Sequence, residues 1–295
     1  MIKNSESKIE TIKKCALKGI VSGDQFRDML VLKGGNAIDL VHDLGNRASI
    51  DLDFSIQGDF DEVEVVALNL ETNLIAMFKE MGLQVFDFKM EPKPTHISVE
   101  IADFWGGYKL SFKLIEANMF TNLGSDLDKL RRSAVNVTAA GAKTFKVDIS
   151  KHECCSKKEL HEVDGFKVYV YSIPMIVAEK LRAICQQMPE YGPIVKRTRL
   201  GSARARDFLD LYSLVSPGYV NPSSIEFQSL VKEVFNMKRV PVSFIGKIIE
   251  SREFHSLDFQ SVVDTVKQDQ LIENFDFYFD FVCQFCQRLE SLWDV

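Results

Sequence analysis

The first half of the chain alternates between stretches of strand-like and helix-like hydrophobic spacing. Helical spacing predicts helices over residues 5–20 and 61–81. A short apolar run over 29–33 predicts a buried strand that enters a Gly-Gly turn, followed by a helix over 36–45. A period of two over 49–56 predicts a half-buried strand, in which four apolar residues alternate with four polar ones: Ile50, Leu52, Phe54 and Ile56 against Ser49, Asp51, Asp53 and Ser55. Further strands are expected over 96–104, 108–117 and 143–150.

Beyond residue 171 the pattern is almost entirely helical. Residues 172–188 and 203–215 predict two helices, the first with Ser172 as a cap and Pro174 in its first turn. The chain ends in a Phe-rich amphipathic segment. We therefore expect an α/β (α+β) fold, with a mixed-sheet domain over 1–170 and a helical domain over 171–295.

Composition describes an ordinary globular chain. Of its 295 residues, 46% are hydrophobic and 26% charged, and the formal net charge is −6. This charge argues against nucleic-acid binding by bulk electrostatics. No apolar run approaches the length of a membrane span, and the amino terminus lacks a signal-like apolar core. Six sparse cysteines show no disulfide framework, so we expect a reduced, cytoplasmic setting without membrane contact.

Two aspartates on the strand over 49–56 carry the candidate chemistry. Side chains two residues apart on a strand point to the same side, about 6.5–7 Å apart at their Cα atoms. Asp51 and Asp53 are therefore placed to share a divalent cation such as Mg²⁺, which prefers oxygen ligands. The alternative is an ordinary amphipathic strand with a wet polar face.

The segment before this strand favours the metal hypothesis. Gly34 and Gly35 lie between a buried strand and a helix, where glycine lets a backbone approach a phosphate closely. Asn36 is expected to cap that helix and to donate to a phosphate oxygen. Arg47 and Ser49 add a cation and a hydroxyl just before the aspartates.

These residues resemble a known family. The segment LKGGNAIDLVHDLGNRASIDLDFSI is similar to the first motif of the DNA polymerase β-like nucleotidyltransferase superfamily, and more narrowly to its AbiEii/AbiGii toxin branch. KTFKVDIS, IVAEKLRAI and RARDFLDLY resemble three later family motifs, in family order. The last 80 or so residues resemble nothing named. Many relatives carry Gly-Ser where this chain has Gly35-Asn36.

The resemblance implies an Mg²⁺- or Mn²⁺-dependent transfer of a nucleotidyl group from an NTP to a hydroxyl acceptor such as the 3′ end of tRNA. It implies the toxin of a toxin–antitoxin or abortive-infection system, with a cognate antitoxin protein as partner. The metal ligands would be Asp51, Asp53 and Asp148, with Glu100 as a competing third ligand. Lys180 would neutralise the triphosphate, and nucleotide contacts would come from Gly34, Gly35, Asn36, Arg47, Ser49, Arg206, Asp207 and Asp210. Asp207 and Asp210 are equally open to a structural role, paired with Arg204 or Arg206.

Other signals leave alternatives open. A zinc site at residues 152–155 with His161 matches no standard spacing, and Cys283-x-x-Cys286 is better explained as buried apolar cysteine. A basic run at 196–206 is either a solvated face or a phosphate-contacting patch. A nucleotide-binding regulatory module without transfer activity and a small-molecule nucleotidyltransferase remain alternative functions. The nucleotide, the acceptor, the antitoxin and the oligomeric state cannot be read from the sequence.

Overall fold

Strands from both ends of the first 171 residues assemble into one mixed sheet. The structure is a computed structural model that describes residues 7–44, 51–138, 140–266 and 271–293. Within those residues the sheet has seven strands in the order β3-β4-β5-β2-β1-β7-β6. Their bounds are β1 Val31–Lys33, β2 Leu52–Ser55, β3 Leu83–Lys93, β4 Gly107–Glu116, β5 Phe145–Ser150, β6 Lys158–Val163 and β7 Phe166–Tyr171.

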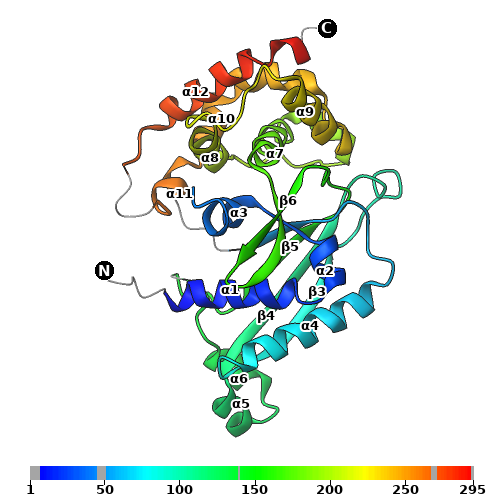
Figure 1. Cartoon of the computed structure of the whole chain (residues 1–295), viewed down its shortest axis with the longest axis vertical. Helices are drawn as coiled ribbons and strands as arrows, with labels where there is room; N and C mark the ends of the chain where they lie inside the picture. The colour runs from blue at the N-terminus through cyan, green and yellow to red at the C-terminus, as the bar shows by residue number, and fades with distance from the viewer. Residues whose placement is uncertain (1–6, 45–50, 139, 267–270, 294–295) are drawn as a thin grey trace.

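Helices cover the sheet and continue beyond it as a helical layer. Figure 1 shows α1 and α4 lying across the sheet, α5 and α6 at the far end, and α7 to α12 gathered above. The α-helices are α1 Lys8–Ile20, α2 Asp24–Met29, α3 Gly34–Leu40, α4 Val63–Lys79, α5 Ala117–Leu123, α6 Leu127–Ser133, α7 Ile173–Cys185, α8 Ala205–Val215, α9 Ile225–Met237, α10 Arg252–Ser256, α11 Phe259–Val263 and α12 Phe275–Gln287. Short 3₁₀ segments are Pro189–Tyr191, Pro193–Val195, Val242–Ser251 and Glu290–Leu292.

The predicted fold class is confirmed, and most of the predicted elements are present. The alternation over 49–56 places Leu52, Phe54 and Ile56 in the core, each at most 2% exposed. The apolar core runs continuously from the sheet into α7, α8 and α12. The division near residue 170 stays a prediction, although each of these seven strands ends at or before Tyr171.

Three details of the predicted secondary structure are wrong. Residues 96–104 form turns instead of a strand, because Val99 is exposed and the backbone closes short loops such as Ile101 N–H to Ser98 O. Asn36 does not cap α3: the helix starts at Gly34, and Asn36 lies fully buried inside it. α3 ends at Leu40, before the predicted end at Gly45, which is outside the described residues.

Three strands escaped prediction. β6 and β7 form an antiparallel hairpin, and β3 pairs with β4 as the edge of the sheet. Polar residues occupy most of β6 and the end of β3, where one side of an edge strand meets solvent. The hydrophobic signal of β6 and of the end of β3 is correspondingly weak. β7 (FKVYVY) has a clear strand signal that the sequence analysis overlooked.

A buried histidine links α8 to α10 and makes stability depend on pH. Nδ1 of His255 accepts a hydrogen bond from the backbone N–H of Arg204 at 3.1 Å, which requires the unprotonated ring nitrogen. His255 is 1% exposed, and burial lowers its pKa from 6.5 to about 4. Because the folded-state pKa is depressed, the stabilising contribution is present above pH 6.5 and is lost as the pH falls toward 4.

We expect the free energy of unfolding to fall by about 2–3 kcal/mol over that interval because of His255. Urea denaturation at pH 7.5, 5.5 and 4.5 measures this, with the same series on His255→Gln. The variant should lose most of this pH dependence, whereas substitution of the exposed His96 by Gln should leave it unchanged. Parallel pH profiles for the wild type and His255→Gln would contradict the assignment.

Candidate active site

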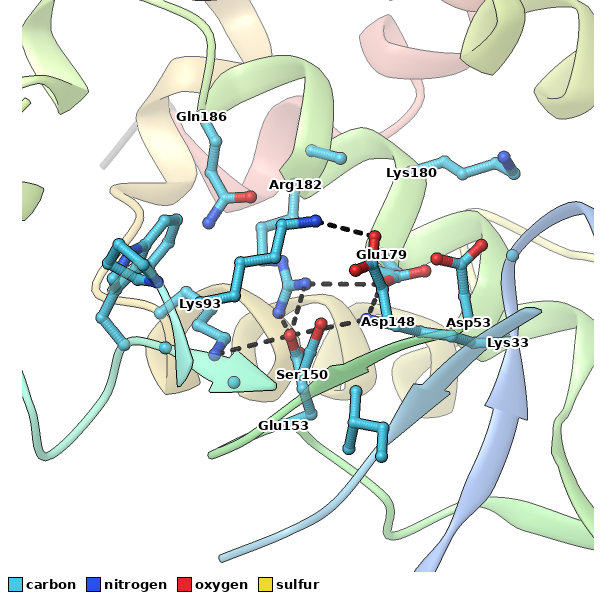
Figure 2. Close-up of a pocket in the computed structure, with 18 of the residues that line it drawn as sticks. Lys33, Asp53, Lys93, Asp148, Ser150, Glu153, Glu179, Lys180, Arg182 and Gln186 are labelled. Carbon is cyan, nitrogen blue, oxygen red and sulfur yellow. Dashed lines mark hydrogen bonds and ion pairs between the residues drawn. The ribbon is translucent and has the colours of Figure 1, made fainter. Parts of the chain in front are cut away.

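Two aspartates from neighbouring parallel strands face each other across the middle of the sheet. The register of β2 and β5 places Asp53 opposite Asp148. Figure 2 shows both carboxyl groups pointing to the same side of the sheet, toward α7. They line a cavity of about 560 Å³ between the sheet and the helical layer. This size fits a small-molecule substrate.

Asp51 stands beside this pair without lining the cavity. It lies one residue before β2 and is half-buried. Its backbone carbonyl accepts a 2.6 Å hydrogen bond from Nδ2 of Asn36, whose Oδ1 accepts from Lys13 at 3.2 Å. The buried Asn36 thus fixes the backbone that leads into β2.

Burial and mutual repulsion make these carboxyl groups reluctant to ionise. Burial, with added repulsion from Asp148, Glu179 and Asp51, raises the pKa of Asp53 from 3.8 to about 7, despite the attraction of Lys33. Burial and Asp148 also raise the pKa of Asp51. Carboxylates in this situation gain from a nearby cation.

The donor set fits a hard divalent cation. Asp51, Asp53 and Asp148 offer only oxygen ligands, which Mg²⁺ prefers. A cation already stands at this position, because Nζ of Lys93 lies 2.7 Å from Oδ2 of Asp148. Across the described ranges, no three His, Cys, Asp or Glu side chains converge tightly enough to form a complete metal site. Asp53 and Asp148 line the cavity with Asp51 beside them, and a site that keeps positions open for substrate oxygens matches the usual habit of Mg²⁺.

The turn after β1 reaches these aspartates directly. Gly34 has φ of +69°, and a Cβ there would lie 2.7 Å from Oδ2 of Asp53. Glycine is therefore required twice, for its conformation and for this close approach. Gly34 and Asp53 thus lie side by side in one wall of the cavity.

A buried network of five charges forms the floor of the cavity. Oε1 of Glu179 lies 2.7 Å from Nζ of Lys33, and Oε2 of Glu153 lies 2.7 Å from Nη1 of Arg182. Nζ of Lys238 is 3.4 Å from Oε1 of Glu153 and donates to the carbonyl of Lys151 at 2.6 Å. All five side chains line the cavity, and Figure 2 labels four of them, Lys33, Glu153, Glu179 and Arg182. Three cations against two anions leave the floor with an excess positive charge, which suits an anionic substrate.

The cations of this network keep Glu153 ionised. Burial alone would raise the pKa of Glu153, but Arg182, Lys33 and Lys238 outweigh it and lower the pKa below its usual range. Burial lowers the pKa of Lys238 to about 8, although Glu153 opposes this. A fixed, water-poor charge pattern of this kind binds an anion with little reorganisation.

The comparison with protein families shows which family the chain belongs to. The family described as "Nucleotidyl transferase AbiEii toxin, Type IV TA system" matches residues 15–281, nearly the whole chain. The chain belongs to this AbiEii family. It is therefore a nucleotidyltransferase of the type the sequence motifs indicate.

Three solved structures that resemble the chain are described here, two from Helicobacter pylori and one from Paracoccidioides brasiliensis. A candidate nucleotidyltransferase of Helicobacter pylori has 17% identity and a TM-score of 0.46, covering 99% of this chain and 98% of that one. JHP933 of Helicobacter pylori has 17% identity and a TM-score of 0.46, covering 98% and 95%. An antigenic nucleotidyltransferase-like protein from Paracoccidioides brasiliensis has 16% identity and a TM-score of 0.37, covering 81% and 93%. No curated protein matches the chain in sequence.

The predicted site residues of this AbiEii member fall into three groups. Gly34, Asp53, Asp148, Lys180 and Asp207 line the cavity, whereas Gly35, Asn36, Asp51, Arg206 and Asp210 are not among its lining residues. Arg47 and Ser49 lie outside the described residues. Glu100, the competing metal ligand, is exposed and pairs with Lys196 at 2.9 Å, away from the cavity.

Lys180 and its neighbours on α8 form a buried ion cluster. Nζ of Lys180 lies 3.0 Å from Oδ1 of Asp207 and 2.6 Å from Oδ2 of Asp210. Asp207 also binds Nε of Arg204, and Nη2 of Arg206 donates weakly to the carbonyl of Ser261. Arg204 is therefore the arginine partner of Asp207, one of the two that the sequence left open.

Several cavity residues were missed by sequence reasoning. Lys33 and Glu179 sit inside the quoted motifs, but roles were assigned to their neighbours Gly34 and Lys180. Glu179 and Arg182 are three residues apart on α7, a spacing that places both on one helix face and was available as a signal. Lys238 lies in a distant loop and offers no sequence signal.

The remaining candidate signals from the sequence are explained by the burial or the position of their residues. Cys283 and Cys286 are buried in the apolar face of α12, as the apolar interpretation predicted. Cys154 and Cys155 are also buried, and the described residues contain no zinc-like cluster. Of the basic run at 196–206, only Arg199 and Arg204 line the cavity. No helix in the described parts of the chain is both long and apolar enough to span a membrane.

Proposed function

We propose that this protein transfers a nucleotidyl group from an NTP to a hydroxyl of an acceptor, with Mg²⁺ or Mn²⁺ held by Asp51, Asp53 and Asp148. The acceptor that family membership favours is RNA, such as the 3′ end of tRNA. The biological role that it favours is that of a toxin restrained by a cognate antitoxin protein. The observation that carries the proposal is the pairing of Asp53 with Asp148 over a cavity with a cationic floor.

Each wall of the cavity has a part in this reaction. The glycine turn and the cations Lys33 and Arg204 would surround the triphosphate, with Arg199 at the rim. When bound, the metal supplies charge stabilisation and a lower pKa for the attacking hydroxyl. The acceptor oxygen forms a bond to the α-phosphorus, the bond to pyrophosphate breaks, and the hydroxyl proton leaves to solvent. The protein contributes chiefly position and fixed charge.

Incubation with each of the four α-labelled NTPs, Mg²⁺ and total RNA tests this function. We expect label to enter RNA with one or more nucleotides and to disappear when EDTA replaces Mg²⁺. Nucleotide binding without any incorporation would support a regulatory module instead. Label in a small product would support a small-molecule transferase.

A further inference from the structure

A second cavity of about 380 Å³ adjoins the first, and none of the roles described so far uses it. The two cavities share one wall, made of Lys93, Pro94, Gly106, Gly107 and Tyr108. Beyond that wall the second cavity extends between the end of β3 and the first turns of α4. Its volume lies in the roughly 300–1,000 Å³ range of small-ligand sites.

Two glycines of the shared wall are packed too closely against neighbouring atoms to carry a side chain. A Cβ on Gly107 would lie 2.1 Å from the carbonyl oxygen of Ile149, so no side chain fits there. Gly106 has φ of +117°, and a Cβ there would lie 3.2 Å from Cδ1 of Ile97 and 3.1 Å from Cε of Lys151. Both of those atoms belong to residues that line the second cavity. The two glycines therefore add only backbone to the shared wall, and its side chains are those of Lys93, Pro94 and Tyr108.

The lining of the second cavity combines apolar surface with two cations, Lys93 and Lys151, and one carboxylate, Glu64. Val63, Met90 and Ile97 supply apolar contacts. Asp59 accepts from the hydroxyl of Tyr108 and from Nζ of Lys151, both at 2.6 Å, which fixes these two side chains in place. With Lys93 at the shared wall, this chemistry suits a ring system attached to phosphate, as in a nucleotide unit.

The order of the strands places this cavity on one side of the aspartates. Across the sheet, the glycine turn follows β1, Asp53 is on β2, Asp148 is on β5, and the shared wall starts at β4. Nucleophile and leaving group occupy opposite sides of the phosphorus in an in-line displacement. With the triphosphate at the glycine turn, the attacking hydroxyl must approach from the Asp148 side, where the second cavity opens.

We propose that the second cavity binds the terminal nucleoside of an RNA acceptor and presents its hydroxyl to the α-phosphate beside Asp148. This inference rests on the proposed function and adds where, and by which residues, the acceptor is held. Ala67 of α4 is partly buried and lines the second cavity but not the first. A larger side chain there should block the acceptor alone.

The test compares Ala67→Phe with Leu68→Phe, a matched change at the next residue, which is 63% exposed and does not line the cavity. With α-labelled NTP and bulk tRNA, Ala67→Phe should raise KM for the tRNA about tenfold or more and leave KM for the NTP unchanged. Leu68→Phe should match the wild type in both. Val63→Phe serves as a second filling variant, and thermal unfolding checks that each variant is folded.

A binding measurement separates failure of this inference from failure of the proposed function. An RNA ending in 4-thiouridine is irradiated with the wild-type protein and Mg²⁺ in the absence of NTP. We expect cross-links within residues 63–67 or 90–97, and their loss in Ala67→Phe. Cross-links elsewhere, no cross-link, or a raised KM for NTP in Ala67→Phe would overturn the inference. Cross-links at these residues without transfer of label would uphold the binding of the acceptor in the second cavity and reject the proposed reaction.

Discussion

Replacing Asp53 with asparagine is expected to abolish transfer and, at the same time, to stabilise the metal-free protein. Loss of a charged metal ligand removes several kcal/mol of transition-state stabilisation, about a thousandfold in rate. The folded-state pKa of Asp53 is raised from 3.8 to about 7, so its favourable contribution to folding exists below pH 3.8 and is lost as the pH rises through 7. At pH 8 the neutral amide avoids that cost, on the order of 4 kcal/mol. Label transfer and urea denaturation in EDTA measure the two effects.

Matched variants define the controls for this experiment. Asp148→Asn should reduce transfer as strongly as Asp53→Asn, whereas Glu100→Gln should leave the rate unchanged, since Glu100 is exposed and pairs with Lys196. Mg²⁺ should raise the melting temperature of the wild type and not that of Asp53→Asn. Full activity in Asp148→Asn together with loss in Glu100→Gln would reverse the assignment of the third ligand.

The aspartates were predictable from sequence because strand periodicity and motif order both point to them. A period of two fixes which side chains of residues 49–56 share a face, and Asp148 follows the same logic on β5. Sequence alone does not reveal that β2 and β5 are neighbours in the sheet. That neighbour relation requires a parallel crossover from residue 55 to residue 145, a distance over which local patterns carry no information.

The charged floor of the cavity was beyond prediction for a different reason. Lys33, Glu153, Arg182 and Lys238 are each at most 7% exposed, although such residues are ordinarily found at the surface. Their burial is tolerable only because they compensate one another, and the partners come from β1, the loop after β5, α7 and the loop after α9. Apart from the spacing of Glu179 and Arg182 on α7, no local pattern in the sequence indicates which of these residues are partners.

The sequence also does not reveal which side chains Lys180 contacts. The resemblance identified the residue and suggested contact with a triphosphate, a role that stays a prediction. The structure adds that α7 presents Glu179 to Lys33 and directs Lys180 to α8. Contacts with two buried aspartates favour a positioning role, in which Lys180 holds α8 and Arg204 against the cavity.

Lys180→Met is therefore expected to lower the free energy of unfolding by about 3–5 kcal/mol, because it removes the buried ammonium that pairs with Asp207 and Asp210 and leaves two buried carboxylates with less positive charge beside them. Urea denaturation at pH 7.5 measures this loss. A second variant, Lys180→Met combined with Asp210→Asn, removes one charge of each sign and should recover most of the stability. If Lys180 acts by positioning, the double variant also recovers most of the transfer activity. A double variant that is as stable as the wild type yet inactive would instead place the lysine ammonium on the substrate and contradict the positioning role.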